Sequence, residues 1–335
     1  MNEKEIKKIM ESCGLPDSCK NIELKETHIS WVILTDNYAF KIKKPVSFSF
    51  LDFSGLEERK YYCEEELALN RRLEPEIYLE VIPVTKGMLT KEGDNEEIVD
   101  YTVKMKRLDN SKEMISMLER DEVHREHIEA LAEKIADFHR KARIIKNAFD
   151  TTGFQEKFAD IESQLPVIKE RFGKEKKDMV TDCLKKSHSY LNRNRSFFND
   201  RIIFGHRKDI HGDLNATNIF LYDEPVIFDC IEFDKEYRQI DIMNEVAFLC
   251  VDLDFYEKQD LREYFTNKYY EFYGIKENTK QREMFNYYKA YRANVRAKIS
   301  LIDALEKKKN NEKEIKNAKR YLDLMNEYFN EIKNI

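Results

Sequence analysis

The stretch HGDLNATNIFLYDEPVIFD, residues 211–229, decides the fold class because it combines four spaced polar residues with two short apolar runs. The runs NIFLY and VIFD are rich in the β-branched and aromatic residues of strands, and Asp223–Pro225 between them is typical of a turn. The pattern therefore predicts a β-hairpin whose first strand begins at Asn218 and whose second strand ends at Asp229.

The predicted hairpin brings oxygen donors to one end. Antiparallel pairing would place Asn218 and Asp229 together, and Asp213 lies on the loop that enters the hairpin. Carboxylate and amide oxygens suit Mg²⁺ when substrate phosphates complete its shell, and a more exposed Asp213 could accept a proton from a hydroxyl. The alternative is that these side chains only accept backbone hydrogen bonds in turns, as Asp and Asn often do.

Composition excludes several classes of protein. The chain has 335 residues, of which 41% are hydrophobic and 12% aromatic, so it is not a disordered sequence. Its net charge of -6, with acids and bases well mixed, argues against a nucleic-acid partner. No apolar run approaches the ~18 residues of a membrane span, and the charged N-terminus lacks the apolar segment of a secretory signal. We therefore expect a cytoplasmic protein with no membrane partner, whose six scattered cysteines are reduced.

The first third of the chain is strand-rich, and alternation in YAFKIK sets Phe40 and Ile42 on the face opposite Ala39 and Lys41. The predicted elements are strands over 28–36 and 38–46 joined by Asp36-Asn37, a helix over 54–75 capped by Ser54, and further strands around a turn at Glu92–Asn95.

From about residue 111 the periodicity becomes helical, with a helix over 123–143 and two more over 154–197 that are separated at Phe172-Gly173. Residues 239–335 are again helical. We therefore predict an α+β fold of two lobes. A small antiparallel β-rich N-terminal lobe with one helix spans 1–108, and a large, mainly helical lobe spans 109–335 and carries the loop and hairpin 209–234.

The form HGDxxxxN, followed by Asp229, resembles the catalytic loop of the protein-kinase-like superfamily, in its aminoglycoside phosphotransferase and choline kinase branch. The resemblance implies a bilobal protein-kinase-like fold, ATP and Mg²⁺ as cofactors, and transfer of the γ-phosphoryl group to a hydroxyl of a small molecule. It makes Asp213 the catalytic base, Asn218 and Asp229 the metal ligands, and His211 a support of the loop. The segments KKPVSFSFLDFS, CEEELALNRRL, FDCIEF and AYRANVRAKIS are similar to an uncharacterised phosphotransferase-like group, some of whose members are fused to a P-loop domain.

The resemblance extends to the nucleotide-binding residues of the first lobe. YAFK resembles the kinase strand VAIK, so Lys41 would contact the α- and β-phosphates. A helical glutamate must position this lysine. Glu66 shares a helix face with Leu69 and Leu73, whereas Glu65 shares it less well, so we predict Glu66.

The segment VKMKRLD resembles the hinge that reads adenine through backbone groups, which points to Met105, Lys106 and Leu108. Kinases also cover the phosphates with a glycine-rich loop, because glycine lets backbone N–H groups approach them. This chain has no glycine between residues 15 and 54, so the loop would lie at Thr27–Trp31, with Ser30 offering a hydroxyl.

Several polar residues of the second lobe have structural interpretations. We expect His139 to be a core histidine, and Asp241 or Glu245 to be a carboxylate that braces the catalytic loop. Asp252 and Asp254 lie in an acidic group with Glu257, which we interpret as a solvated helix end; the alternative is a patch that attracts substrate amines.

The sequence therefore predicts a small-molecule kinase whose acceptor is a sugar, amino sugar, aminoglycoside or amino alcohol, and which is a monomer or homodimer. A nucleotide-binding pseudokinase or regulatory module is the alternative, because the phosphate loop lacks glycine. A protein kinase is disfavoured, because no APE segment or long activation loop follows Asp229. The sequence also lacks GxxxxGK[ST], which excludes a Walker P-loop mechanism.

Overall fold

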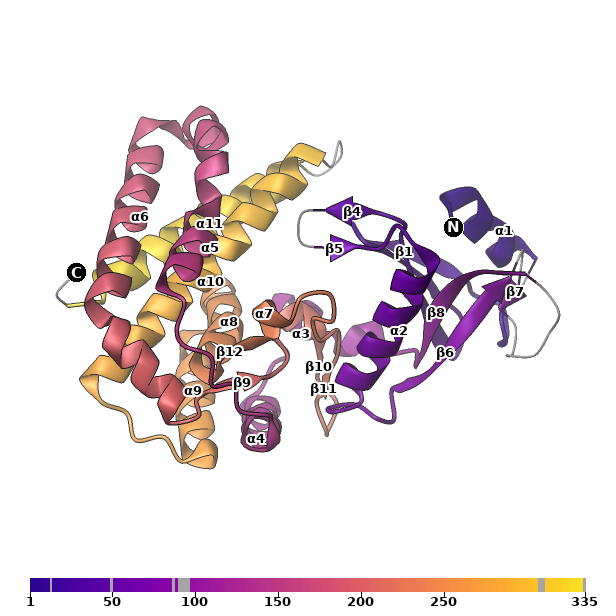
Figure 1. The fold of residues 1–335 in the computed structure, drawn as a ribbon, viewed down its shortest axis with the longest axis horizontal. Coiled ribbons are helices and arrows are strands. Elements are labelled where there is room, and N and C mark those ends of the chain that lie inside the picture. Colours follow the sequence, from indigo (N-terminus) through magenta and orange to yellow (C-terminus); the bar gives the residue numbers. More distant parts are fainter. Residues whose placement is uncertain (13, 49–50, 86–87, 90–96, 307–310, 334–335) are drawn as a thin grey trace. The chain divides into compact units, whose positions relative to one another are not determined.

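A computed structural model of the chain describes residues 1–335 except 13, 49–50, 86–87, 90–96, 307–310 and 334–335 (Figure 1). The chain divides into two compact units, each built from two segments. The first unit combines Met1–Met117 with Thr217–Arg238, and the second combines Leu118–Ala216 with Gln239–Ile335. The sequence analysis placed the whole of 209–234 in the helical lobe, whereas in this division its hairpin belongs to the first unit.

The first unit is built on an antiparallel sheet in the order β1-β2-β3-β8-β6-β7. Its strands are β1 (Glu23–Glu26), β2 (Ser30–Leu34), β3 (Tyr38–Lys43), β6 (Tyr78–Thr85), β7 (Met88–Leu89) and β8 (Ile98–Lys106). The hairpin predicted at Asp36-Asn37 joins β2 to β3, and Lys41 of β3 is paired with Val32 and Val103 on its two sides. A separate two-stranded antiparallel pair consists of β4 (Ser47–Phe48) and β5 (Leu51–Asp52). The turn predicted at Glu92–Asn95 lies outside the described residues.

Both faces of this sheet are covered, which explains why β3 is buried along almost its whole length. Helix α1 (Glu3–Glu11) packs Ile6 and Ile9 against the face that carries Phe40 and Ile42. Helix α2 (Leu56–Asn70) lies over the other face (Figure 1), where Cys63 belongs to the same cluster as Ala39. The lysines of β3 therefore point toward a helix and not toward solvent.

Helix α2 is shorter than predicted, and the prediction that Ser54 caps it was wrong. The N-cap residue of the helix is Gly55, which has no side chain to accept a hydrogen bond from the first turn. The guanidinium of Arg59 instead donates to the carbonyl oxygens of Phe53, Ser54 and Gly55. A side chain from inside the helix thus satisfies the carbonyl groups before its first turn.

The predicted hairpin is present as β10 (Ile219–Phe220) and β11 (Val226–Ile227), with Ile219 opposite Ile227 and Phe220 opposite Val226. It is preceded by the 3-10 helix η3 (Ala216–Asn218) and followed by the short helix α7 (Lys235–Arg238). It is tied into the first unit by a bridge between Glu113 and Phe220 and by the Ile227 N–H, which donates to Glu74 at 2.7 Å.

The second unit is mainly helical. Its helices are α4 (Arg125–Lys141), α5 (Thr151–Ala159), α6 (Leu165–Ile203), α8 (Ile242–Phe255), α9 (Gln259–Tyr273), α10 (Thr279–Glu306) and α11 (Asn311–Asn330), with η2 (Asp160–Gln164) between α5 and α6. Helix α3 (Met114–Glu119) lies mostly in the first unit, and the second unit begins within its last turn. The break predicted at Phe172-Gly173 is confirmed, because Gly173 has φ 88° inside α6. Strands β9 (Arg207–Asp209) and β12 (Gln239–Asp241) pair antiparallel, with Asp209 opposite Gln239, so the loop after β9 begins beside the first residue of β12.

No helix among the described residues is long and apolar enough to cross a bilayer. Cys63, Cys183, Cys230 and Cys250 are free thiols, whereas Cys19 is disulfide-bonded. The expectation that every cysteine is reduced was therefore wrong for Cys19, because spacing along the chain does not decide which thiols the fold brings together.

Candidate active site

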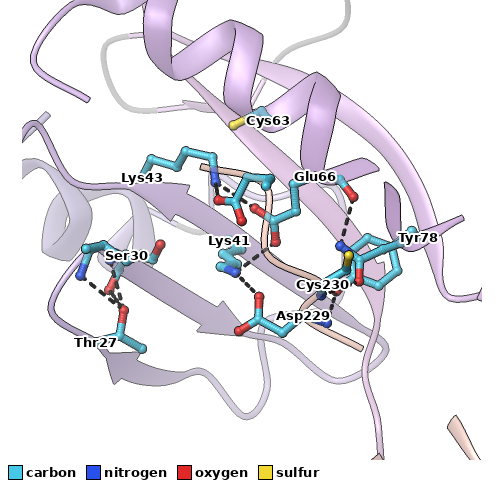
Figure 2. A network of polar contacts seen from close by, with 12 residues as sticks. Thr27, Ser30, Lys41, Lys43, Cys63, Glu66, Tyr78, Asp229 and Cys230 are labelled. Carbon is cyan, nitrogen blue, oxygen red and sulfur yellow. Dashed lines mark hydrogen bonds and ion pairs between the residues drawn. The ribbon is translucent and has the colours of Figure 1, made fainter. Parts of the chain in front are cut away.

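A buried network of charged side chains lies between β3 and α2 in the first unit (Figure 2). The Lys41 ammonium lies 2.8 Å from Glu66 Oε1 and 2.5 Å from Asp229 Oδ1. Glu66 uses its other oxygen, Oε2, to accept from Lys43 at 2.8 Å, and Lys43 also pairs with Glu232. One glutamate therefore joins two lysines of the same strand, and each lysine reaches a carboxylate of the segment that follows β11.

Glu66 is the glutamate of α2 that contacts Lys41, and it is fully buried, whereas Glu65 is half-buried. The face of α2 that is buried differs from the one used in the sequence argument. It consists of Arg59, Cys63, Glu66 and Asn70, while Leu69 is only half-buried. Polar residues can occupy the inner face of this helix because each has a partner there. Glu66 contacts the lysines of β3, Arg59 pairs with Asp100 of β8, and Asn70 Oδ1 accepts from the Cys230 N–H.

Electrostatics favour the ionised forms of Lys41 and Glu66. Burial alone would lower the pKa of Lys41, but the carboxylates of Asp229 and Glu66 outweigh burial and hold that pKa well above its ordinary value. Burial would likewise raise the pKa of Glu66, and the two lysines instead lower it to about 2. For Glu232 burial dominates and raises the pKa of the carboxyl group.

Asp229 has an unusual backbone conformation. Its φ is 66°, a left-handed value that non-glycine residues rarely adopt and that neighbouring contacts must maintain. Its N–H donates to the Tyr78 hydroxyl at 3.0 Å, and the next N–H, of Cys230, donates to Asn70 Oδ1 at 2.9 Å (Figure 2). The side chain is 39% exposed, so one face of this carboxylate is open to solvent while Lys41 contacts the other.

Asn218 and Asp229 lie at the same end of the hairpin. The Asn218 carbonyl oxygen accepts from the Phe228 N–H at 3.1 Å, which places Asn218 opposite the residue before Asp229. The two residues offer an amide oxygen and a carboxylate, the donor types that Mg²⁺ prefers. In the described part of the chain no group of three or more His, Cys, Asp or Glu is arranged to hold a metal ion. The amide oxygen of Asn218 and the carboxylate of Asp229 fit Mg²⁺ as two donors of a ligand set that phosphate oxygens and water would complete.

The turn between β1 and β2, the expected phosphate loop, is closed by its own hydrogen bonds. The Thr27 hydroxyl oxygen accepts from the N–H groups of Ile29 and Ser30, at 3.4 and 3.0 Å. The Thr27 N–H donates back to the Ser30 carbonyl oxygen. The Ser30 hydroxyl is buried and makes no hydrogen bond with any residue that the structure describes. Backbone donors that glycine-rich loops direct at phosphate are here used within the turn.

The expected hinge follows directly from β8. Met105 is buried and paired with Ala39. The N–H groups of Lys106 and Arg107 donate to the carbonyl oxygens of Ile77 and Asn37. A base that binds here through an N–H group would therefore use Leu108, which is half-buried at the end of the expected segment.

The loop with His211 and Asp213 belongs to the second unit. His211 is buried, and its Nδ1 accepts from the Asp213 N–H at 3.2 Å. Gly212 has φ 89°, which favours glycine, and its N–H donates to Glu245 Oε1 at 2.5 Å. These contacts fix the backbone on both sides of Asp213, whose side chain remains half-exposed.

Glu245 is the carboxylate that braces this loop. Its other oxygen lies 2.6 Å from His139 Nε2, and His139 Nδ1 lies 2.7 Å from the Tyr269 hydroxyl. His139 is therefore a buried structural histidine, as the sequence suggested. Asp241 instead caps α8 and pairs with Arg201 at 2.5 Å.

The prediction that Asp252 and Asp254 form a solvated helix end was wrong. Both are buried. Asp252 accepts from the Ala216 N–H at 2.9 Å and pairs with Arg296 of α10. Asp254 pairs with Arg262 of α9. Their partners lie on later helices, so a local pattern could not reveal the burial.

No family model matches the chain. Three uncharacterized mycobacterial proteins, Mb2027c of Mycobacterium bovis and MT2060 and Rv2004c of Mycobacterium tuberculosis, are each 31% identical over 290 residues, which cover 84% of this chain and 55% of the relative. The chain thus spans about half the length of the curated relatives it matches.

The chain has the kinase-like fold of several solved small-molecule kinases. Solved structures with this fold include the amicoumacin kinase hAmiN in complex with AMP-PNP and Ca²⁺, with a TM-score of 0.58, 12% identity, and coverage of 97% of this chain and 96% of that one. The microcompartment-associated aminopropanol kinase follows with a TM-score of 0.55, 13% identity and 96% coverage of both chains. A choline/ethanolamine kinase family protein from Mesorhizobium loti has a TM-score of 0.51, 12% identity and 92% coverage of both.

The sequence analysis did not single out Lys43 or Glu232. The sequence could have indicated both, because Lys43 follows Lys41 by two positions in YAFKIK and Glu232 follows Asp229 by three positions in FDCIEF. Alternation puts Lys43 on the same strand face as Lys41. A second lysine beside a predicted buried lysine needs a second acid, and Glu232 supplies it.

Proposed function

We propose that the protein is an ATP- and Mg²⁺-dependent phosphotransferase that moves the γ-phosphoryl group to a hydroxyl of a small molecule. The observation that carries the proposal is the contact of Lys41 with both Glu66 and Asp229. This contact places a cation, a positioning glutamate and a candidate metal ligand together, in a fold that the named small-molecule kinases share.

The residues of the first unit would bind and orient the nucleotide. Lys41 would leave Asp229 for the α- and β-phosphates and stay oriented by Glu66, which is fully buried and holds its charge at neutral pH. Asn218 and Asp229 would hold Mg²⁺, which when bound supplies charge neutralisation of the phosphates. Leu108 would offer a backbone N–H to the base.

Asp213 would act on the acceptor. Phosphoryl transfer needs little covalent help from the protein, so a base mainly orients the hydroxyl and takes its proton. The Asp213 side chain is half-exposed while its N–H is held by His211, an arrangement that suits a carboxylate which must receive a diffusing substrate.

The acceptor class is proposed from chemistry and from the neighbours. The neighbours' names include amicoumacin, aminopropanol and choline or ethanolamine, so hydroxyl compounds that carry an amine belong in a first screen. Asp252 and Asp254 are neutralised by arginines and would not recognise that amine. Neutral sugars therefore belong in the screen on equal terms with amino sugars, aminoglycosides and amino alcohols.

One observation favours the alternative, a nucleotide-binding regulatory module. The Thr27–Ser30 turn uses its N–H groups internally, which weakens the hold on the phosphates that phosphoryl transfer requires. Such a module would bind ATP through Lys41 without transferring phosphate.

Two measurements separate the proposals. Thermal unfolding with ATP plus Mg²⁺ tests nucleotide binding, since a ligand that binds the folded state raises Tm. An ATP-consumption screen over the four acceptor classes, with Asp213→Asn as the control, tests transfer. Turnover that disappears in the variant supports the kinase. Binding without turnover against every class supports the regulatory module, and no binding contradicts both.

A further inference from the structure

We infer that Lys43 and Glu232 are positioning residues that clamp the Asp229 segment to β3 and so hold Asp229 ready for Mg²⁺. The inference rests on the proposed function, because it concerns the geometry of that same site. Lys43 lies two residues beyond Lys41 on β3, and Glu232 lies three residues beyond Asp229. The two ion pairs thus join the same two segments at neighbouring points.

Burial separates Lys43 from a direct role with substrate. The side chains of Lys43 and Glu66 are 0% exposed and that of Glu232 is 4% exposed. The Lys43 ammonium is held by two carboxylates, and the ring of Phe53 lies 4.9 Å away. A phosphate would have to displace both carboxylates to reach this ammonium, so Lys43 acts on the other residues of the site.

The Asp229 conformation explains what the clamp does. A φ of 66° at a non-glycine residue persists only where surrounding contacts over-determine it. Tyr78 and Asn70 hold the backbone at Asp229 and Cys230, and both are uncharged partners. The Lys43–Glu232 pair adds a charged tether three residues further on. Asp229 is then anchored on both sides of its strained bond.

The ion pair is better explained by geometry than by stability. Replacing a buried ion pair with apolar residues of similar volume is often neutral or stabilising, because two charges must lose their water. A pair that adds little stability can still fix the position of its segment. Groups behind the direct ligands of a metal commonly change its affinity by roughly 10- to 100-fold when they are removed.

The experiment compares ATP binding with and without Mg²⁺ by calorimetry. In Glu232→Gln we expect the Mg²⁺-dependent gain in ATP affinity to fall by about tenfold or more, while affinity without Mg²⁺ changes by less than about twofold. The double variant Lys43→Met with Glu232→Met should unfold near the wild-type Tm and show the same loss. Asp100→Asn, which removes the buried Arg59–Asp100 pair of the same unit, is the matched control and should keep the full gain.

A second readout is independent of nucleotide. The amides of Asp229 and Cys230 donate to Tyr78 and Asn70, so their hydrogen exchange reports how firmly the segment is held. We expect faster exchange of these amides in Glu232→Gln than in wild type or Asp100→Asn. Unchanged exchange, or equal loss of affinity with and without Mg²⁺, would overturn the clamp. A wild-type protein that binds no ATP would overturn the proposed function, and the exchange measurement would still decide on the clamp.

Discussion

The ammonium of Lys41 lies 2.5 Å from a carboxylate oxygen of Asp229, although the two residues are 188 positions apart in the chain. The contact joins the two chain segments of the first unit, Met1–Met117 and Thr217–Arg238, which are separated in the sequence by residues of the second unit. Lys41 thereby pairs with the carboxylate that is proposed to hold the metal. In the proposed function, Lys41 would pair with the nucleotide phosphates and Asp229 with Mg²⁺.

Lys41→Met should remove most ATP affinity while the unit stays folded. The variant leaves Glu66 paired with Lys43, so one buried carboxylate keeps a cation. Loss of a charged contact to phosphate commonly costs about 2–5 kcal/mol, which corresponds to a fall in affinity of roughly 30-fold or more. Calorimetric titration with ATP measures it. Lys41→Arg should not restore affinity, because the planar fork of arginine does not match this point contact. Wild-type affinity in Lys41→Met would contradict the assignment.

Asp229→Asn should abolish Mg²⁺-dependent ATP binding with little effect on folding. Asparagine tolerates a positive φ at least as well as aspartate, so the backbone can keep its conformation. The amide loses the charge that attracts Mg²⁺. Titration of ATP at several Mg²⁺ concentrations is the measurement. A variant whose affinity still rises with Mg²⁺ as in wild type would show that the metal is held elsewhere.

Acid should destabilise the first unit through Glu66. The pKa of this carboxyl group is about 2 in the folded protein and near 4.5 when unfolded. Because the folded pKa is the lower one, its contribution is complete above pH 4.5 and is lost as the pH falls toward 2. Urea unfolding between pH 2 and 7 should show a smaller decline in this range for Glu66→Gln than for wild type. If the free energy of unfolding depends on pH in the same way in Glu66→Gln and in wild type, the ion pairs of Glu66 do not form in solution.

Glu245→Ala should destabilise the second unit and impair turnover together. Glu245 is buried between the Gly212 N–H and His139, so its removal leaves a backbone donor and an imidazole without their acceptor. We expect a loss of about 3 kcal/mol in the free energy of unfolding. Urea denaturation measures it. Glu257→Ala, at an exposed position shortly after α8, is the control and should change stability by less than about 0.5 kcal/mol. Equal free energies of unfolding for the two variants would contradict the role of Glu245 as the brace of this loop.

The hairpin could be predicted from the sequence because its determinants are local. Asp223–Pro225 forms the turn, and two short β-prone runs set the register that brings Asn218 near Asp229. The choice of Glu66 over Glu65 was also within reach, since a helix face follows from spacing. The face itself was misjudged, because polar residues and not leucines line its buried side.

The remaining features depend on contacts between distant parts of the chain. Lys43 looks like a solvated strand residue until α2 covers that face of the sheet. Asp252 and Asp254 look like an exposed acidic group until arginines of α9 and α10 reach them. A single sequence contains each partner but does not state which pairs meet.

The most direct test of the central claim is transfer of labelled γ-phosphoryl from ATP to an acceptor from the screen, measured in wild type and in Asp213→Asn. The account predicts that wild type labels the hydroxyl compound and that the variant binds ATP with unchanged affinity but transfers less than about 1% as fast, consistent with loss of a general base. Transfer by Asp213→Asn at the wild-type rate would contradict the role of Asp213, and the absence of transfer by wild type to every acceptor class would contradict the proposed enzyme.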